Sequence, residues 1–158
     1  MKAWPSSREA QVEVEKLKVL FLCTGNSCRS QMAEGWAKAL KSETIDAWSA
    51  GLETHGLNPH AVHVMSEVGI DISGHKSELV ADLLQIPFDL VITVCSNAHE
   101  SCPVFPGTTK VVHHGFDDPP RLAAMATSDQ QAWPHYRRVR EEIRAFVADL
   151  PDSPDALD

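Results

Sequence analysis

The feature that most constrains this chain is an apolar run that leads directly into a small polar loop and then into a helical pattern. Residues 19–22 are all apolar, which is typical of a strand buried on both faces of a parallel sheet. The loop over 23–29 contains small and polar side chains and one glycine. Beyond it, apolar residues recur at helical spacing, namely Met32, Ala33, Trp36, Ala37 and Leu40. The pattern predicts a strand over 17–22, a tight loop, and a helix over 30–41.

A loop between a strand and a helix N-terminus is suited to binding an oxyanion. Its backbone N–H groups converge, and the helix dipole adds partial positive charge at the same point. Cys23 ends the strand and Arg29 closes the loop. Because a helix N-terminus and a nearby guanidinium both favour the ionised thiol, we expect Cys23 to be a thiolate nucleophile at neutral pH. Arg29 can hold a tetrahedral oxyanion through two parallel hydrogen bonds.

Other residues of the same loop have uses in this chemistry. Ser30 can hydrogen-bond the thiolate or the leaving sulfur, and Gly25 or Asn26 can take the left-handed backbone conformation that an anion cradle needs. Cys28 either forms a side disulfide with Cys23 or is a small, half-buried loop residue. The alternative interpretation of this loop is purely structural: a buried cysteine followed by a helix-capping turn. The strand and the helix on either side favour an oxyanion site instead.

Strands and helices alternate along the rest of the chain. Asn58 and Pro59 are a typical helix start, and Gly69 suits the end of that helix. The other predicted elements are a strand over 44–48 that turns away at 49–51, a short helix from a capping Ser77 to Leu84, a buried strand over 89–94, a polar loop over 96–108, a strand over 110–113, a loop over 115–120, and a helix that begins between Asp129 and Pro134 and ends near Leu150. This alternation predicts an α/β domain with a parallel sheet and right-handed crossovers.

Length and charge narrow the class of protein. The 158 residues fit one domain, which we place at 17–150, with an N-terminal extension over 1–16 and an acidic tail over 151–158. The net charge of −8 and the lack of a basic block argue against nucleic acid and anionic membranes as partners. Neither a membrane-spanning run nor a signal-peptide pattern is present, so we expect a cytoplasmic protein. In that compartment the four cysteines are expected to be reactive rather than structural.

A second set of reactive groups follows later strands. Cys95 ends the strand over 89–94, and Cys102 lies in the loop after it. Ligands of open α/β sheets gather at the carboxyl ends of the strands, so Cys95 and Cys23 are expected to face one site. Asp117 and Asp118 lie in a later loop, where an acid held near the anion can protonate a leaving oxygen.

The histidines do not form a metal-binding pattern. His60 and His63 are one helical turn apart with His55 nearby, and His113 and His114 are adjacent. Neither group has the further ligands at suitable spacing that a metal site requires. We therefore predict no metal site in this chain.

Residues 23–34 resemble the signature of the low-molecular-weight tyrosine phosphatase fold, and more narrowly that of its arsenate reductases recycled by thioredoxin. The resemblance runs from Leu17 to about Leu150, through Ser49-Ala50-Gly51, Thr54-His55-Gly56, Asn58-Pro59, Val94-Cys95-Ser96, Cys102-Pro103 and Gly115-Phe116-Asp117-Asp118-Pro119. It implies four parallel strands with helices on both faces. It also implies an oxyanion site made by Thr24, Gly25, Asn26, Ser27, Cys28 and Arg29.

The resemblance further implies how the site would be used. Arsenate is the expected substrate, with phosphate or sulfate as analogues, and thioredoxin is the expected electron donor, with no tightly bound cofactor. The acid of the family aligns with Asp118, which leaves a turn or capping role for Asp117. The resemblance to some relatives also suggests a binding site for a monovalent cation near Asn26, Glu34 and Ser49. This chain has Glu78 at the position where those relatives can have a shorter acidic residue.

Three functions compete on the sequence alone. A phosphatase needs only Cys23, Arg29 and the acid, whereas a reductase needs further thiols, which Cys95 and Cys102 supply as a redox-active disulfide pair. Phosphatases of this fold typically carry Asp-Pro-Tyr at the acid loop, and this chain has Asp118-Pro119-Pro120 instead. An oxyanion- or redox-sensing module without enzymatic activity is the third alternative, and no feature favours it specifically. Arsenate reductase is therefore the predicted function.

Overall fold

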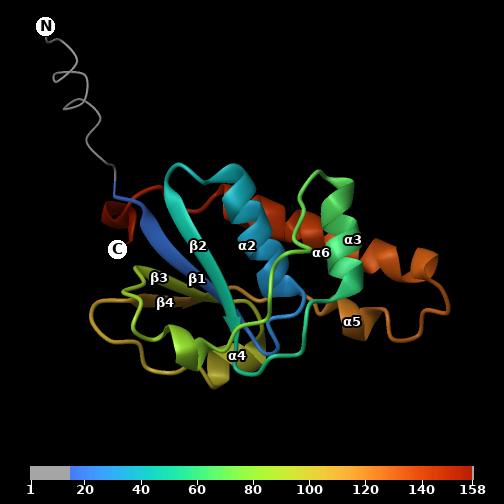
Figure 1. The fold of residues 1–158 in the computed structure, drawn as a ribbon, viewed down its shortest axis with the longest axis horizontal. Helices are drawn as coiled ribbons and strands as arrows, with labels where there is room; N and C mark the ends of the chain where they lie inside the picture. The colour runs from blue at the N-terminus through green and yellow to red at the C-terminus, as the bar shows by residue number, and fades with distance from the viewer. Residues whose placement is uncertain (1–14, 158) are drawn as a thin grey trace, which may run out of the picture.

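Strand β1 (Leu17–Cys23) is central to the sheet of the computed structural model, which describes residues 15–157. It pairs in parallel with β2 (Ile45–Gly51) on one side and with β3 (Leu90–Thr93) on the other. A fourth strand, β4 (Lys110–His113), completes the order β2-β1-β3-β4 (Figure 1). The apolar residues of β1 are buried, as the apolar run predicted. The predicted four-stranded parallel sheet is confirmed.

The helices pack around this sheet. They are α2 (Arg29–Leu40), α3 (Pro59–Glu67), α4 (Ser96–Glu100), α5 (Pro119–Leu122) and α6 (Asp129–Ala148), with short 3-10 helices η1 (Val80–Leu83) and η2 (Pro154–Ala156). Helix α2 contacts β1 and β2, and α6 packs against α2 and α3. Helix α4 lies at the end of the sheet where the strands finish (Figure 1). The layers therefore leave the carboxyl ends of β1 and β3 next to α4.

Local signals account for the ends of α3. The side chain of Asn58 accepts hydrogen bonds from the N–H groups of His60 and Ala61, which caps the helix. Gly69 takes a positive φ of 81°, and the N–H groups of Gly69 and Ile70 bond the last helical carbonyls. The predicted start and end of this helix are both confirmed.

Four predicted segments differ from the structure, and one of them is the loop over 115–120, in which helix α5 already begins at Pro119. Residues 49–51 continue β2 instead of turning away, because they pair with residues 21–23 of β1 and are small enough to be buried there. The segment 77–84 forms only η1, and the Ser77 hydroxyl bonds the carbonyl of Asn26 instead of capping a helix. The segment 96–108 is not entirely loop, since α4 begins directly after Cys95.

The two ends of the chain were predicted to lie outside the catalytic domain. Residues 1–14 of the expected extension lie outside the described residues. At the other end, Lys41 Nζ contacts the Leu150 carbonyl at 3.0 Å and Asp152 Oδ1 at 2.8 Å, so the start of the acidic tail is held to the domain. No helix within residues 15–157 has the length and apolar character needed to cross a membrane.

Candidate active site

The loop over residues 23–29, here called the anion loop, joins β1 to the N-terminus of α2. Its turn is made at Asn26, whose φ of 49° is the left-handed conformation expected of Gly25 or Asn26. A second segment runs along it: the N–H groups of Leu52, Glu53, His55 and Asn58 donate to the carbonyls of Cys23, Thr24, Gly25 and Ser27 at 3.2, 2.8, 2.9 and 3.0 Å. The backbone of the anion loop is therefore fixed from outside as well as by its own sequence.

Two consecutive hydrogen bonds connect the Cys23 sulfur to Ser30 and Ser30 to Asn26. Its Sγ lies 2.8 Å from Ser30 Oγ, and Asn26 Nδ2 donates to the same Ser30 oxygen at 2.8 Å. An amide nitrogen can only donate, so Ser30 accepts that bond and has its own hydrogen left for the sulfur. All three side chains are buried. Ser30 is therefore placed to hydrogen-bond the Cys23 sulfur, and its role in the chemistry stays a prediction.

A buried polar network supports the anion loop from behind. Gln31 Nε2 donates to the Asn26 side-chain oxygen at 3.0 Å and to the Asn26 carbonyl at 3.1 Å. Gln31 Oε1 lies 2.9 Å from His75 Nδ1. Burial lowers the pKa of His75, which favours the neutral form of this ring. Because Asn26 and Gln31 have no exposed surface, the network fixes the loop without help from solvent.

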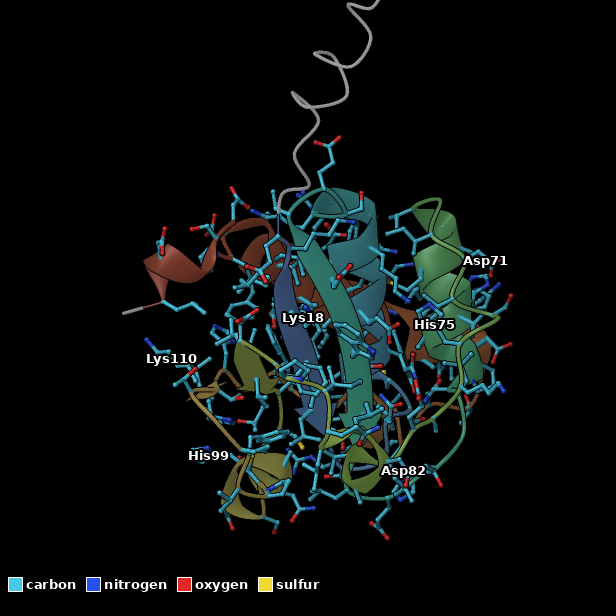
Figure 2. All side chains as sticks on the ribbon, turned by 60° about the vertical axis from the view of Figure 1, so that its left-hand side comes forward. Lys18, Asp71, His75, Asp82, His99 and Lys110 are labelled. Atoms are coloured by element: carbon cyan, nitrogen blue, oxygen red, sulfur yellow. The ribbon has the colours of Figure 1, made fainter. Side chains whose placement is uncertain are left out.

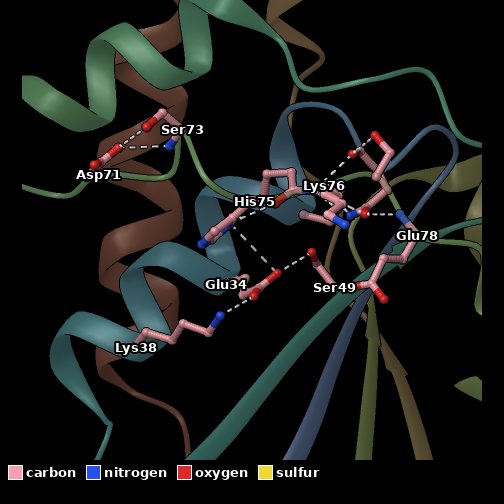
Figure 3. A network of polar contacts seen from close by, with 12 residues as sticks. Glu34, Lys38, Ser49, Asp71, Ser73, His75, Lys76 and Glu78 are labelled. Carbon is pink, nitrogen blue, oxygen red and sulfur yellow. Dashed lines mark hydrogen bonds and ion pairs between the residues drawn. The ribbon is translucent and has the colours of Figure 1, made fainter.

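The same network contains the residues considered for a monovalent cation. The Glu34 carboxylate accepts hydrogen bonds from Ser49 and Lys38, and Asn26 Oδ1 accepts one from the Glu78 N–H at 2.8 Å (Figure 3). These oxygens therefore already have protein donors. Among the described residues, no group of three or more His, Cys, Asp or Glu side chains is arranged to hold a metal ion. A cation at this position stays a prediction.

A cavity of about 410 Å³ opens above the anion loop. It is lined by Cys23, Thr24, Gly25, Ser27, Cys28, Arg29, His55, Asn58, Asp118 and Pro120. The structure thus brings together the predicted nucleophile, arginine, acid and most of the predicted oxyanion-binding residues. Asn26 and Ser30 are buried and act on the loop through the contacts described above.

The two neighbouring aspartates have different surroundings. Asp118 lines the cavity, and its Oδ1 lies 3.7 Å from Arg29 Nη2. The Asp117 carboxylate instead accepts a hydrogen bond from Arg138 of α6 at 2.8 Å. Arg29 also donates through Nη1 to the carbonyl of Phe116 at 2.9 Å, so the loop over 114–118, which carries Asp118, is bonded to the anion loop.

The other cysteines lie at graded distances from this cavity. Cys95 is buried, and its Sγ is 3.3 Å from Thr24 Oγ1 and accepts from the Ala98 N–H at 3.4 Å as the cap of α4. Cys102 is half-buried beyond α4, packs against the edge of the core, and donates a hydrogen bond to the carbonyl of its neighbour Pro103. Burial raises the pKa of Cys102. The structure therefore brings Cys95 to the anion loop and leaves Cys102 at the far end of α4.

Cys28 has a separate character. It is buried, and burial raises the pKa of its thiol despite the opposing charge of Arg29. All four cysteines are free in the structure, so Cys28 has no disulfide with Cys23. Cys28 is thus a small loop residue with a neutral thiol, but it is buried instead of half-buried as predicted.

Sequence reasoning did not select His55, Asn58 or Pro120 for the site, although all three line the cavity. Asn58 was assigned only a capping role, which it also has. The available signal was the position of residues 52–58 directly after a strand of the sheet. The carboxyl ends of parallel strands share one edge, so a segment after β2 should reach the same site as the loop after β1.

Comparison with known proteins places these features in context. The model of the low molecular weight phosphotyrosine protein phosphatase family matches residues 18–151. "Arsenate reductase 2" of Staphylococcus saprophyticus is 48% identical over 140 residues, which cover 89% of this chain and all of the relative. A solved arsenate reductase in the phosphate binding state is 36% identical, with a TM-score of 0.66 over 83% of this chain and 93% of that one. The low molecular weight protein tyrosine phosphatase from T. tengcongensis is 28% identical, with a TM-score of 0.65 over 84% and 95%.

Proposed function

The chain belongs to the low molecular weight phosphotyrosine protein phosphatase family, and we propose that within this family it is an arsenate reductase. The observation that carries the proposal is the contact between Cys95 and the anion loop, where Cys95 Sγ lies 3.3 Å from Thr24, the residue next to Cys23. A phosphatase has no use for a second cysteine here. A reductase needs one, because arsenate must gain two electrons.

The first step uses the groups around the cavity. The Cys23 thiolate attacks the arsenic atom of arsenate, whose oxygens bind to the loop N–H groups and to Arg29. Asp118 donates a proton to the departing oxygen, which leaves as water. The product is a covalent Cys23–arsenate adduct. Asp118 and Arg29 both line the cavity, with Asp118 Oδ1 3.7 Å from Arg29 Nη2, which supports this assignment of roles.

Two further attacks by cysteine thiols release arsenite and then free Cys23. The Cys95 thiolate attacks the Cys23 sulfur, the sulfur–arsenic bond breaks with its electron pair left on arsenic, and arsenite departs. A Cys23–Cys95 disulfide remains. Cys102 then attacks Cys95, which frees Cys23 and leaves a Cys95–Cys102 disulfide. Since α4 separates these two residues, this exchange requires α4 to unfold locally.

An external dithiol must then reduce the Cys95–Cys102 disulfide, and thioredoxin is the proposed donor. Thiol exchange needs an accessible sulfur, and the partly exposed Cys102 supports attack from outside. A cycle that depends on free thiols is also suited to a reducing compartment, in agreement with the expected cytoplasmic location.

The side chains that line the cavity give less support to the phosphatase alternative. Pro120 lines the cavity, and the single tyrosine of the chain, Tyr136, is buried in α6 with its hydroxyl 3.2 Å from Asn58 Nδ2. No Phe, Tyr or Trp side chain lines the described cavity to hold the ring of an aryl phosphate. Phosphatase activity, where measurable, is expected to be a minor activity of the same Cys23 site.

The test is a coupled assay of arsenate-dependent NADPH oxidation with thioredoxin and thioredoxin reductase, run beside hydrolysis of an aryl phosphate. We expect sustained arsenate turnover and slow ester hydrolysis. Turnover of the ester with no consumption of arsenate would make the protein a phosphatase. Omission of thioredoxin, with glutaredoxin and glutathione in its place, identifies the electron donor.

A further inference from the structure

The contact between Thr24 and Cys95 has a third member on α4. Asn97 Nδ2 donates to Thr24 Oγ1 at 3.1 Å, and the same Thr24 oxygen lies 3.3 Å from Cys95 Sγ. Because the amide nitrogen has no lone pair to offer, Thr24 must accept this bond. The one hydrogen of the threonine hydroxyl is then free for the sulfur.

The arrangement repeats the one at the first nucleophile. There, Asn26 donates to Ser30, and Ser30 faces the Cys23 sulfur at 2.8 Å. In both places an asparagine amide sets the direction of a hydroxyl, and the hydroxyl faces a cysteine. The Asn26 side chain is fully buried and has other partners, whereas the Asn97 side chain is exposed and makes only this hydrogen bond among those the structure describes.

Two donors therefore converge on the Cys95 sulfur. One is the Thr24 hydroxyl, and the other is the Ala98 N–H at the N-terminus of α4. A thiolate is stabilised by hydrogen-bond donors, and the thiolate is the form that attacks a disulfide or an adduct. If the Thr24 hydroxyl hydrogen no longer pointed at the sulfur, Cys95 would lose one of these two donors.

We propose that Asn97 is a positioning residue that turns the Thr24 hydroxyl toward Cys95 and so favours the thiolate of the second nucleophile. The proposal rests on the proposed function for the step that this thiolate performs, but the hydrogen-bond direction can be tested without arsenate. Asn97→Asp keeps the shape of the side chain and reverses its chemistry. The carboxylate takes the Thr24 hydrogen for itself and leaves the sulfur without it.

The test is the rate of alkylation of Cys95 by iodoacetamide in the full-length reduced protein, measured from pH 6 to pH 9. Trypsin leaves Cys95 and Cys102 together in the peptide 77–110, so tandem mass spectrometry gives both rates from one peptide. Cys102 is the internal reference for unfolding of α4, which would expose both cysteines. Ser96→Asp is the matched control, since it adds the same charge to α4 without touching Thr24.

We expect Asn97→Asp to slow alkylation of Cys95 at pH 7 by about tenfold and Asn97→Ala by about threefold, the range of one hydrogen bond. The pH profile of Cys95 should move to higher pH in both variants. Ser96→Asp should change the rate less than about twofold, as expected for an exposed charge. Equal rates in wild type and Asn97→Asp, or an equal loss in Ser96→Asp, would overturn the proposal. Failure of the wild type to reduce arsenate would instead reject the proposed function and leave this result unaffected.

Discussion

The two segments that carry the cysteines are held in different ways. In the anion loop and the first turn of α2, the side chains of Asn26, Ser30 and Gln31 have no exposed surface and bond one another or neighbouring backbone. In the segment from Ser96 to Val104, Ala98 alone is buried, and Val104 is 92% exposed. Figure 2 shows His75, beside the buried network, and His99, on α4, on either side of β1 and β2.

This difference corresponds to the two tasks that the proposed cycle requires. The anion loop must present N–H groups and a thiolate in a fixed geometry, since a preorganised site gains most from each donor. The segment after Cys95 must change shape so that Cys102 can reach Cys95. Few buried contacts and exposed backbone hydrogen bonds make local opening inexpensive. The proposed cycle therefore assigns rigidity and mobility to two neighbouring segments at one edge of the sheet.

The largest expected effect comes from the rigid side. Cys23→Ser should reduce arsenate turnover to background, because a serine hydroxyl is not ionised at neutral pH. Arg29→Lys should also cause a severe loss, since an ammonium group cannot make the two parallel bonds of a guanidinium. The coupled NADPH assay measures both. Substantial turnover by either variant would contradict the assignment of the site.

On the mobile side, Cys102→Ser should permit one turnover and then stop. The Cys23–Cys95 disulfide should accumulate, because no thiol remains to release Cys23. Cys95→Ser should stop earlier, at the arsenate adduct. Mass spectrometry of peptides from arsenate-treated, acid-trapped protein identifies each species. Normal cycling of Cys102→Ser with thioredoxin would show that α4 need not move and would remove the basis of the comparison.

Asp118→Asn should have the next largest effect. Loss of a general acid typically slows the assisted step by about two to four powers of ten. Single-turnover adduct formation should slow by this amount, while phosphate affinity measured by calorimetry changes little. Asp117→Asn is the matched control, because Asp117 pairs with Arg138 at the surface. A larger loss in Asp117→Asn would mean that the other aspartate is the acid.

The smallest effects concern stability, where one asparagine from each segment can be compared. Asn26→Ala should lower the free energy of unfolding by about 3 kcal/mol or more, because it strands buried partners and places alanine at a positive φ. Asn97→Ala should change it by less than about 0.5 kcal/mol, as is usual at exposed positions. Urea unfolding followed by tryptophan fluorescence measures both. Similar losses in the two variants would mean that both segments are equally rigid.

The sequence by itself determined the anion loop and the strand and helix on either side of it. The positions of Cys23, Arg29 and Ser30 followed from these elements. These features depend on neighbours within a few residues, where apolar spacing, capping and loop composition act directly. The order of strands and helices followed from the same local patterns together with the handedness of crossovers. The parallel sheet and the start of α3 at Pro59 were predicted in this way.

Only the tertiary structure decided which distant side chains meet. Thr24 and Cys95 are 71 positions apart, and Gln31 and His75 are 44 apart. Their contacts depend on the register of the strands and on the direction of each side chain, which sequence periodicity does not specify. The separation of Asp117 from Asp118 has the same origin, since one faces Arg138 of α6 and the other faces the cavity. Short stretches of the chain determine which reactive side chains lie next to one another in sequence. The hydrogen bonds that orient these side chains form only when the folded sheet brings distant stretches together.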